Sequence, residues 1–127
     1  MTENELSKIV FALGLKMHKR LDDGLFERVY DECLFYELRK LGLEIDKQKV
    51  YPIVYDDLLI ENAFRIDMII ENKLILEIKA VEFINDTHKA QLLTYLKMTG
   101  CRLGTLINFR TDVFKNGVKR VVNGLQD

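Results

Sequence analysis

Apolar residues recur at helical spacing in three segments of the chain. Thr2 and Glu5 form a capping-box pattern at the start of the first segment, residues 3–20. The second predicted helix covers residues 25–41 and ends at Gly42, and the third covers residues 86–99 and ends at Gly100. The apolar positions that define the first helix are Leu6, Ile9, Val10, Leu13 and Met17.

Between the second and third helices the spacing changes to that of strands. We expect strands over residues 50–55 and 63–70, joined by a polar turn at Asp56 and Asp57, and a third strand over residues 73–80. Residues 103–109 form another apolar strand, and residues 118–122 are a candidate edge strand. This order of elements predicts one α/β domain over residues 1–127 with a mixed sheet.

The strands over residues 63–70 and 73–80 form a hairpin with an unusual charge distribution. A turn at residues 71–73 places Asp67 opposite Glu77 and Arg65 opposite Lys79. The other side of the hairpin is then one apolar face. Its members are Phe64, Ile66, Met68, Ile70, Leu74, Leu76, Ile78 and Ala80.

An ordinary solvated face is the alternative interpretation of the charged side of this hairpin. Such a face would pair opposite charges, because like charges in register are destabilising by roughly 0.2–1 kcal/mol. Two carboxylates forced together usually share a proton or a divalent cation, and Mg²⁺ accepts carboxylate oxygens. Lys79 lies on the same face as Glu77, so its ammonium can reach water or phosphate beside such a cation.

An acid also interrupts the apolar stripe of the second predicted helix. Glu27 falls on the stripe that carries Tyr30 and Leu34, where a buried carboxylate is normally paired, metal-bound or protonated. Glu27 is therefore a candidate third ligand. The alternative is that Glu27 lies at the helix N-terminus and complements the helix dipole.

The third predicted helix carries His88, Gln91 and Tyr95 at positions that share one face. A solvated helix face is the alternative interpretation. Gln91 and Tyr95 are suited to orienting a lysine or a substrate phosphate, and His88 to a place beside phosphate or metal-bound water.

Composition narrows the function classes. The net charge of −1 lacks the basic excess of a tight nucleic-acid binder, so nucleic-acid binding would be local or metal-assisted. Residues 110–120 are the best local basic segment, with a solvated surface as the alternative. Cys33 and Cys101 have no metal-site spacing and are expected to be packed thiols. Short apolar runs and the lack of a signal-peptide pattern predict a cytoplasmic protein without membrane segments.

The motifs together resemble a known superfamily. Asp67, followed ten residues later by Glu77-Ile78-Lys79, resembles the D…(D/E)xK signature of PD-(D/E)XK nucleases, with Ile66 where the signature often has proline. The segment Gln91 to Tyr95 resembles the QxxxY element of the RecB-like branch. Residues 24–30, 88–96 and 106–109 resemble the small GxxExxY family, so the likeness covers nearly the whole chain.

The resemblance implies a restriction-endonuclease-like core, with a central four-stranded mixed sheet flanked by helices. It implies Mg²⁺ or Mn²⁺ held by Asp67 and Glu77, with a contribution from Glu27. Lys79 would orient or activate water, and Gln91 and Tyr95 would support the lysine and the substrate. The remaining candidates for supporting or substrate-contacting roles are Tyr30, Arg65 and His88.

The leading functional hypothesis is metal-dependent hydrolysis of phosphodiester bonds in DNA, with RNA as the alternative substrate. The rival hypotheses are a catalytically silent adaptor for nucleic acid or protein, hydrolysis of another phosphate such as a nucleotide, and a purely structural protein. A nuclease domain this small often acts as a homodimer or beside a partner protein, because one copy offers few phosphate contacts.

Overall fold

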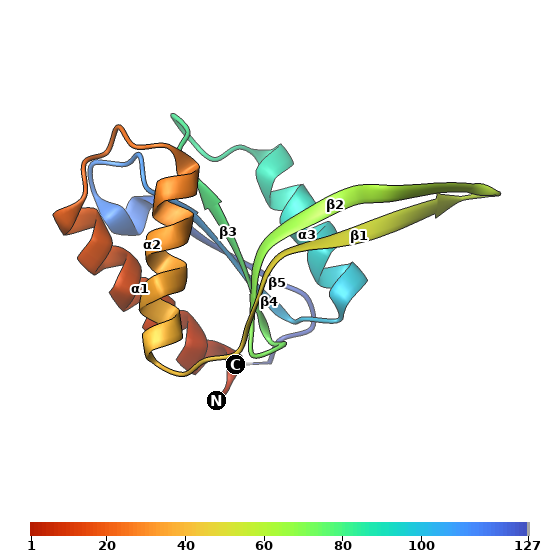
Figure 1. Cartoon of the computed structure of the whole chain (residues 1–127), viewed down its shortest axis with the longest axis horizontal. Helices are drawn as coiled ribbons and strands as arrows, with labels where there is room; N and C mark the ends of the chain where they lie inside the picture. The colour runs from red at the N-terminus through yellow and green to blue at the C-terminus, as the bar shows by residue number, and fades with distance from the viewer. Residues whose placement is uncertain (127) are drawn as a thin grey trace.

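The structure is a computed structural model that describes residues 1–126, in which helices cover both faces of one mixed sheet (Figure 1). The helices are α1 (Glu3–Arg20), α2 (Glu27–Lys40) and α3 (Asp86–Thr99), with a short 3-10 helix, η1 (Phe114–Gly117). The strands are β1 (Ile45–Tyr55), β2 (Leu58–Ile70), β3 (Leu74–Lys79), β4 (Leu103–Asn108) and β5 (Val118–Val122). None of the helices in this described part is long and apolar enough to cross a membrane.

The sheet has the strand order β1-β2-β3-β4-β5. β3 and β4 are parallel and are connected through α3, whereas every other neighbouring pair is antiparallel. The predicted α/β class and mixed sheet are confirmed, but within residues 1–126 the sheet has five strands and not four, because the candidate edge strand at residues 118–122 also forms. The fifth strand, β5, pairs along β4 from Val122 opposite Leu103 to Val118 opposite Ile107. It forms because β4 is buried along its whole length and its backbone needs hydrogen-bond partners on both edges.

Helix boundaries agree closely with the sequence pattern because local chemistry sets them. The side chain of Thr2 accepts a hydrogen bond from the backbone of Glu5, and the Glu5 carboxylate accepts one from the backbone of Thr2. Gly42 and Gly100 follow α2 and α3 with positive φ angles of 76° and 80°, a conformation that glycine adopts without strain. α2 begins at Glu27, two residues later than predicted.

β1 and β2 are longer than the apolar pattern predicts. β1 begins at Ile45 and β2 at Leu58, because backbone pairing continues past the point where side chains are buried. Charged residues in both strands obscure the alternation on which the prediction relied. As expected, Asp56 and Asp57 form the connecting turn. The outer half of this hairpin projects beyond the rest of the molecule (Figure 1).

Two apolar cores lie on opposite faces of the sheet. The core under α1 and α2 contains Met68 and Ile70 of β2, whereas Ile66 and Ile69 pack in the core under α3. The predicted single apolar face of the hairpin is therefore wrong at its outer end, where Phe64 and Ile66 belong to the α3 side. Two residues three positions apart can share a face only if the alternation is interrupted. The interruption falls between Ile66 and Met68, at Asp67.

Candidate active site

Asp67 and Glu77 are held together by reciprocal hydrogen bonds between β2 and β3. The ladder pairs Ile70 with Leu74 and Met68 with Leu76, as predicted, and then stops. Beyond it, Glu77 Oε2 accepts a hydrogen bond from the Asp67 backbone N–H at 2.7 Å. Asp67 Oδ2 accepts one from the Ile78 backbone N–H at 2.8 Å. Each carboxylate thus replaces a carbonyl of the ladder and separates the two strands.

The separation of the strands changes the position of the two predicted basic residues. Arg65 lies opposite Val50 of β1, and Lys79 lies opposite Asn108 of β4. The β2–β3 ladder ends at the pair of Met68 and Leu76, so the predicted pairing of Arg65 with Lys79 is wrong. Before Asp67 along the chain, β2 is paired with β1 alone, and after Leu76, β3 is paired with β4 alone.

Burial raises the pKa of both carboxyl groups of the acidic pair. Glu77 is only 4% exposed, and burial, followed by the nearby Asp67 carboxylate, raises the pKa of Glu77 to about 8. Burial also raises the pKa of Asp67, against the lowering effect of the Ile78 N–H and the Lys79 charge. Without a cation, a proton on Glu77 is therefore favoured at neutral pH.

A pocket of about 430 Å³ opens beside Asp67, between α2 and the inner ends of β1 and β2. Its charged lining has both signs, which suits a ligand that carries an anion and a cation together. The lining residues are Glu27, Arg28, Asp31, Glu32, Lys47, Gln48, Arg65, Asp67 and Ile78. Of the predicted site residues, the pocket brings Glu27 and Arg65 together with Asp67.

Glu27 reaches this pocket from an exposed position, so the prediction that it lies on a buried stripe is wrong. Glu27 is the first residue of α2, and its neighbour Phe26, used to set the stripe, is 82% exposed. Glu27 therefore occupies the helix N-terminus, as the alternative interpretation held, and also lines the pocket.

Asp31 is a pocket-lining residue that the sequence pattern did not single out. It is only 7% exposed, lies one helical turn after Glu27, and its Oδ1 is 2.7 Å from Lys47 Nζ. Its negative charge helps to raise the pKa of both Asp67 and Glu77. The available signal was its position directly after Tyr30 and three residues before Leu34 on the buried side of α2.

β1 contributes Gln48, a second missed residue. Gln48 has a positive φ angle of 54°, and its side chain makes a hydrogen bond to the Asp67 carboxylate, which lowers the pKa of Asp67. This backbone conformation is uncommon for a non-glycine residue and is typical of functional or strained positions. Its neighbours Lys47 and Lys49 pair normally with Met68 and Ile66.

Lys79 is partly buried at the end of β3, where its charge lowers the pKa of both acids. The Lys79 carbonyl accepts a hydrogen bond from Phe109 N at 3.0 Å. Asn108, only 1% exposed, fixes the chain that follows: its Nδ2 donates to the Val81 carbonyl, and its Oδ1 accepts from the Val81 N–H. Asn108 is thus a positioning residue, signalled only by an amide within an apolar strand.

A family model for the PD-(D/E)XK nuclease superfamily matches residues 4–121. The chain belongs to this superfamily. No curated protein and no solved structure matches it. Members of the superfamily are usually hydrolytic nucleases that use divalent metals.

The donor atoms fit a hard divalent cation in part. Asp67 Oδ2 and Glu77 Oε2 each accept a backbone hydrogen bond. Carboxylate oxygen is the ligand type that Mg²⁺ and Mn²⁺ accept. Within residues 1–126, no group of three or more His, Cys, Asp or Glu side chains is close enough to hold a metal. The structure therefore brings two carboxylates together, and the predicted set with Glu27 is not preassembled.

α3 of this PD-(D/E)XK protein places Tyr95 near the acidic pair. Tyr95 is 3% exposed and its ring contacts Phe64 edge-on, with 5.7 Å between ring centroids. Burial, then the charges of Glu77 and Asp67, raises the Tyr95 pKa to about 12, so the hydroxyl remains a proton donor. Gln91 lies one turn earlier on α3 and is exposed.

Two predicted supporting residues make contacts elsewhere. His88 belongs to the cap of α3, where its Nδ1 accepts a hydrogen bond from Asn85 N at 3.2 Å. Tyr30 is 1% exposed and stacks on Phe109 with ring centroids 4.6 Å apart. Its hydroxyl donates to the Asp22 carbonyl and anchors the loop that leads into α2.

Proposed function

We propose that this protein is a metal-dependent nuclease that hydrolyses phosphodiester bonds, with DNA as its substrate. The observation that supports this most strongly is the buried pair Asp67 and Glu77, held by reciprocal hydrogen bonds at the point where β2 and β3 separate. Two buried, ionised carboxylates in contact raise the free energy of the folded state unless a proton or a cation compensates their charge. Membership of a superfamily of nucleases supports the cation.

Mg²⁺ or Mn²⁺ is the proposed cofactor, with Asp67 and Glu77 as its protein ligands. Such a cation supplies polarisation of the phosphoryl oxygen and a lower pKa for a bound water. Glu27 and Asp31 lie one turn apart on α2 and line the same pocket as Asp67, so both are proposed to contribute negative charge to this site.

The chain's own side chains have distinct proposed roles. Lys79 positions the attacking water or the scissile phosphate, because its charge already acts on both acids. Arg65 is exposed at the pocket and is placed to bind a phosphate oxygen as negative charge develops there. Tyr95, kept protonated by its surroundings, is proposed to donate a hydrogen bond near the acids, and the exposed Gln91 is proposed to contact the substrate.

The test is cleavage of single- and double-stranded DNA by the purified protein in Mg²⁺ and in Mn²⁺. Wild-type protein should cleave, and Lys79→Ala should lose cleavage while its circular dichroism is unchanged. Lys97→Ala, which removes an exposed lysine near the end of α3, is the matched control and should retain activity. Undiminished cleavage by Lys79→Ala would show that the lysine has no catalytic role.

A parallel reaction with RNA and with free nucleotides addresses the substrate class. If the protein cleaves RNA and not DNA, RNA is the substrate. If it hydrolyses only free nucleotides, the assignment as a nuclease is wrong. No hydrolysis of any substrate, in protein that binds the cation, would favour a catalytically silent adaptor.

A further inference from the structure

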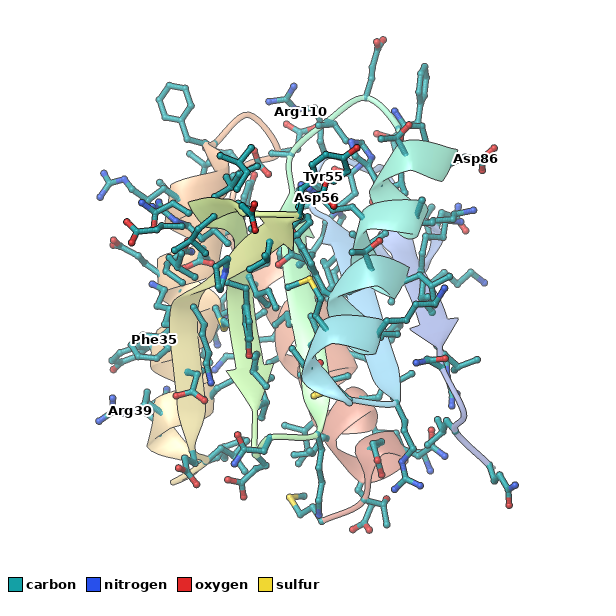
Figure 2. All side chains as sticks on the ribbon, turned by 90° about the vertical axis from the view of Figure 1, so that its right-hand side faces the viewer. Phe35, Arg39, Tyr55, Asp56, Asp86 and Arg110 are labelled. Carbon is teal, nitrogen blue, oxygen red and sulfur yellow. The ribbon has the colours of Figure 1, made fainter. Side chains whose placement is uncertain are left out.

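The hairpin of β1 and β2 ends in an apolar projection. We call residues 53–60 the β1–β2 arm; Figure 2 shows Tyr55 and Asp56 at its end, which points toward the viewer. Six large apolar side chains of the arm are each at least 36% exposed. They are Ile53, Val54, Tyr55, Leu58, Leu59 and Ile60. A two-stranded hairpin of this kind has little stability in water unless another surface covers it.

One face of the arm continues the core under α3. Residues opposite each other in an antiparallel pair point to the same side, and Tyr51 and Phe64, which form such a pair, both pack on the α3 core. The register shifts between this pair and the next, Ile53 and Ile60, with one residue between the pairs on β1 and three on β2. Both steps, of two and four positions, are even, so we assign Ile53 and Ile60 to this same side. Tyr55 and Leu58, the next pair on this side, complete an apolar strip that leaves the core and extends into solvent.

The charge of the arm argues against nucleic acid as its occupant. Residues 50–64 contain Asp56, Asp57 and Glu61 and no lysine or arginine, so this surface would repel phosphates. Pro52 lacks a backbone N–H and lies at a register shift of the edge strand β1. Pairing of β1 with the edge of another sheet is thereby disfavoured. The surface available for contact is the apolar face.

The same face carries the ammonium of Lys49 at its base, 5.6 Å from the centre of the Tyr51 ring and, at 4.0 Å, at the outer limit of an ion pair with the exposed Asp46. Lys49 lies opposite Ile66, a residue of the α3 core, and therefore points to the same side as the apolar strip. Asp57 is four residues beyond Ile53 along the chain, and Lys49 is four residues before it. A two-fold axis through the Ile53–Ile60 pair would consequently place the acidic tip of one copy beside Lys49 of another.

We propose that the arm is a homodimerisation surface, in which two arms pack antiparallel through their α3-side faces. Such a contact is self-complementary. The apolar strips of the two copies pack against each other, and the acidic turn of each arm lies beside Lys49 of the other copy. The proposal is independent of the nuclease activity, since none of these residues belongs to the acidic pair or lines its pocket.

Sedimentation velocity over a range of concentrations of the full chain tests this proposal. Wild type should form a dimer, and the double variant Ile53→Thr/Ile60→Thr should weaken the dimer by about tenfold or more, since threonine keeps strand propensity but removes apolar contact. Val54→Thr/Leu59→Thr changes the adjacent pair, which points to the other face, and should remain dimeric. Monomeric wild type, or loss of the dimer only in the control variant, would overturn the proposal.

Charge reversal tests the antiparallel arrangement and relies less on the folding of the arm. Lys49→Glu should weaken the dimer by about threefold, as expected for an exposed ion pair, and Asp57→Lys in the same chain should restore it. Circular dichroism and thermal unfolding confirm that each variant is folded. Equal dimerisation by wild type and Lys49→Glu, or further weakening in the Lys49→Glu/Asp57→Lys chain, would overturn the antiparallel packing.

Discussion

Asp67 and Glu77 exchange hydrogen bonds with each other's strands: Glu77 accepts from the backbone of Asp67, and Asp67 accepts from the backbone of Ile78. The two carboxylates therefore lie where a strand ladder would otherwise continue. This arrangement fixes the acids and separates β2 from β3. It also creates a buried negative site whose electrostatics can be measured.

The first prediction concerns the pH dependence of stability. The pKa of Glu77 is raised from 4.5 to about 8 in the folded protein, so between these values the folded state binds more protons than the unfolded state. Without divalent cations, the free energy of unfolding should therefore fall as pH rises from about 4.5 to about 8, and then level off. The raised pKa of Asp67 acts in the same direction. Urea denaturation at several pH values measures the slope.

Glu77→Gln should remove most of this slope, because glutamine resembles the protonated acid at every pH. The variant should be more stable than wild type near pH 8 and similar to it near pH 4.5. Glu61→Gln, at an exposed position of β2, is the matched control and should keep the wild-type slope. A wild-type stability that is constant over this range would contradict the raised pKa.

The second prediction concerns divalent cations. Mg²⁺ or Mn²⁺ should raise the melting temperature at pH 8. A cation that binds the folded protein and not the unfolded chain stabilises the folded state by about 1.4 kcal/mol when its free concentration is ten times Kd. The effect should shrink towards pH 5, where protons compete for the same oxygens. Asp67→Asn should abolish the shift, whereas Asp112→Asn, at an exposed position, should preserve it. An unchanged metal titration in Asp67→Asn would place the cation elsewhere.

The third prediction separates the two acids of α2. Asp31 is buried and acts on the pKa of both Asp67 and Glu77, whereas Glu27 is exposed at the pocket. Asp31→Asn should therefore weaken Mn²⁺ binding, measured by calorimetry, more than Glu27→Gln does. The opposite order would support Glu27 as the third ligand that the sequence predicted.

The fourth prediction concerns Tyr30, whose hydroxyl bonds to the Asp22 carbonyl and to Leu25 N. Tyr30→Phe should lower the free energy of unfolding by about 1 kcal/mol, because the Asp22 carbonyl loses its donor and the Leu25 N–H loses its acceptor. DNA cleavage by Tyr30→Phe should remain close to that of wild type when both proteins are assayed below their melting temperatures. Tyr36→Phe, at an exposed position, should change neither quantity. Full stability with lost cleavage in Tyr30→Phe would indicate a direct role in substrate binding.

The sequence alone predicted those features that depend on neighbouring residues. The capping box at Thr2 and Glu5 and the glycine ends of α2 and α3 involve contacts within a few positions, so their patterns are visible in the chain. The contact of Asp67 with Glu77 was also predictable, because a short turn fixes the register of the hairpin over its first three pairs.

The tertiary structure decided what depends on distant segments. The sequence pattern does not show that Arg65 pairs with β1 and Lys79 with β4. Strand pairing depends on how the whole sheet buries its two faces. The place of Asp31 in the site likewise follows from how α2 lies on the sheet, since Lys47, its ion-pair partner, is 16 residues away along the chain. Local spacing determined the helices and the acidic pair, and long-range packing determined which side chains surround that pair.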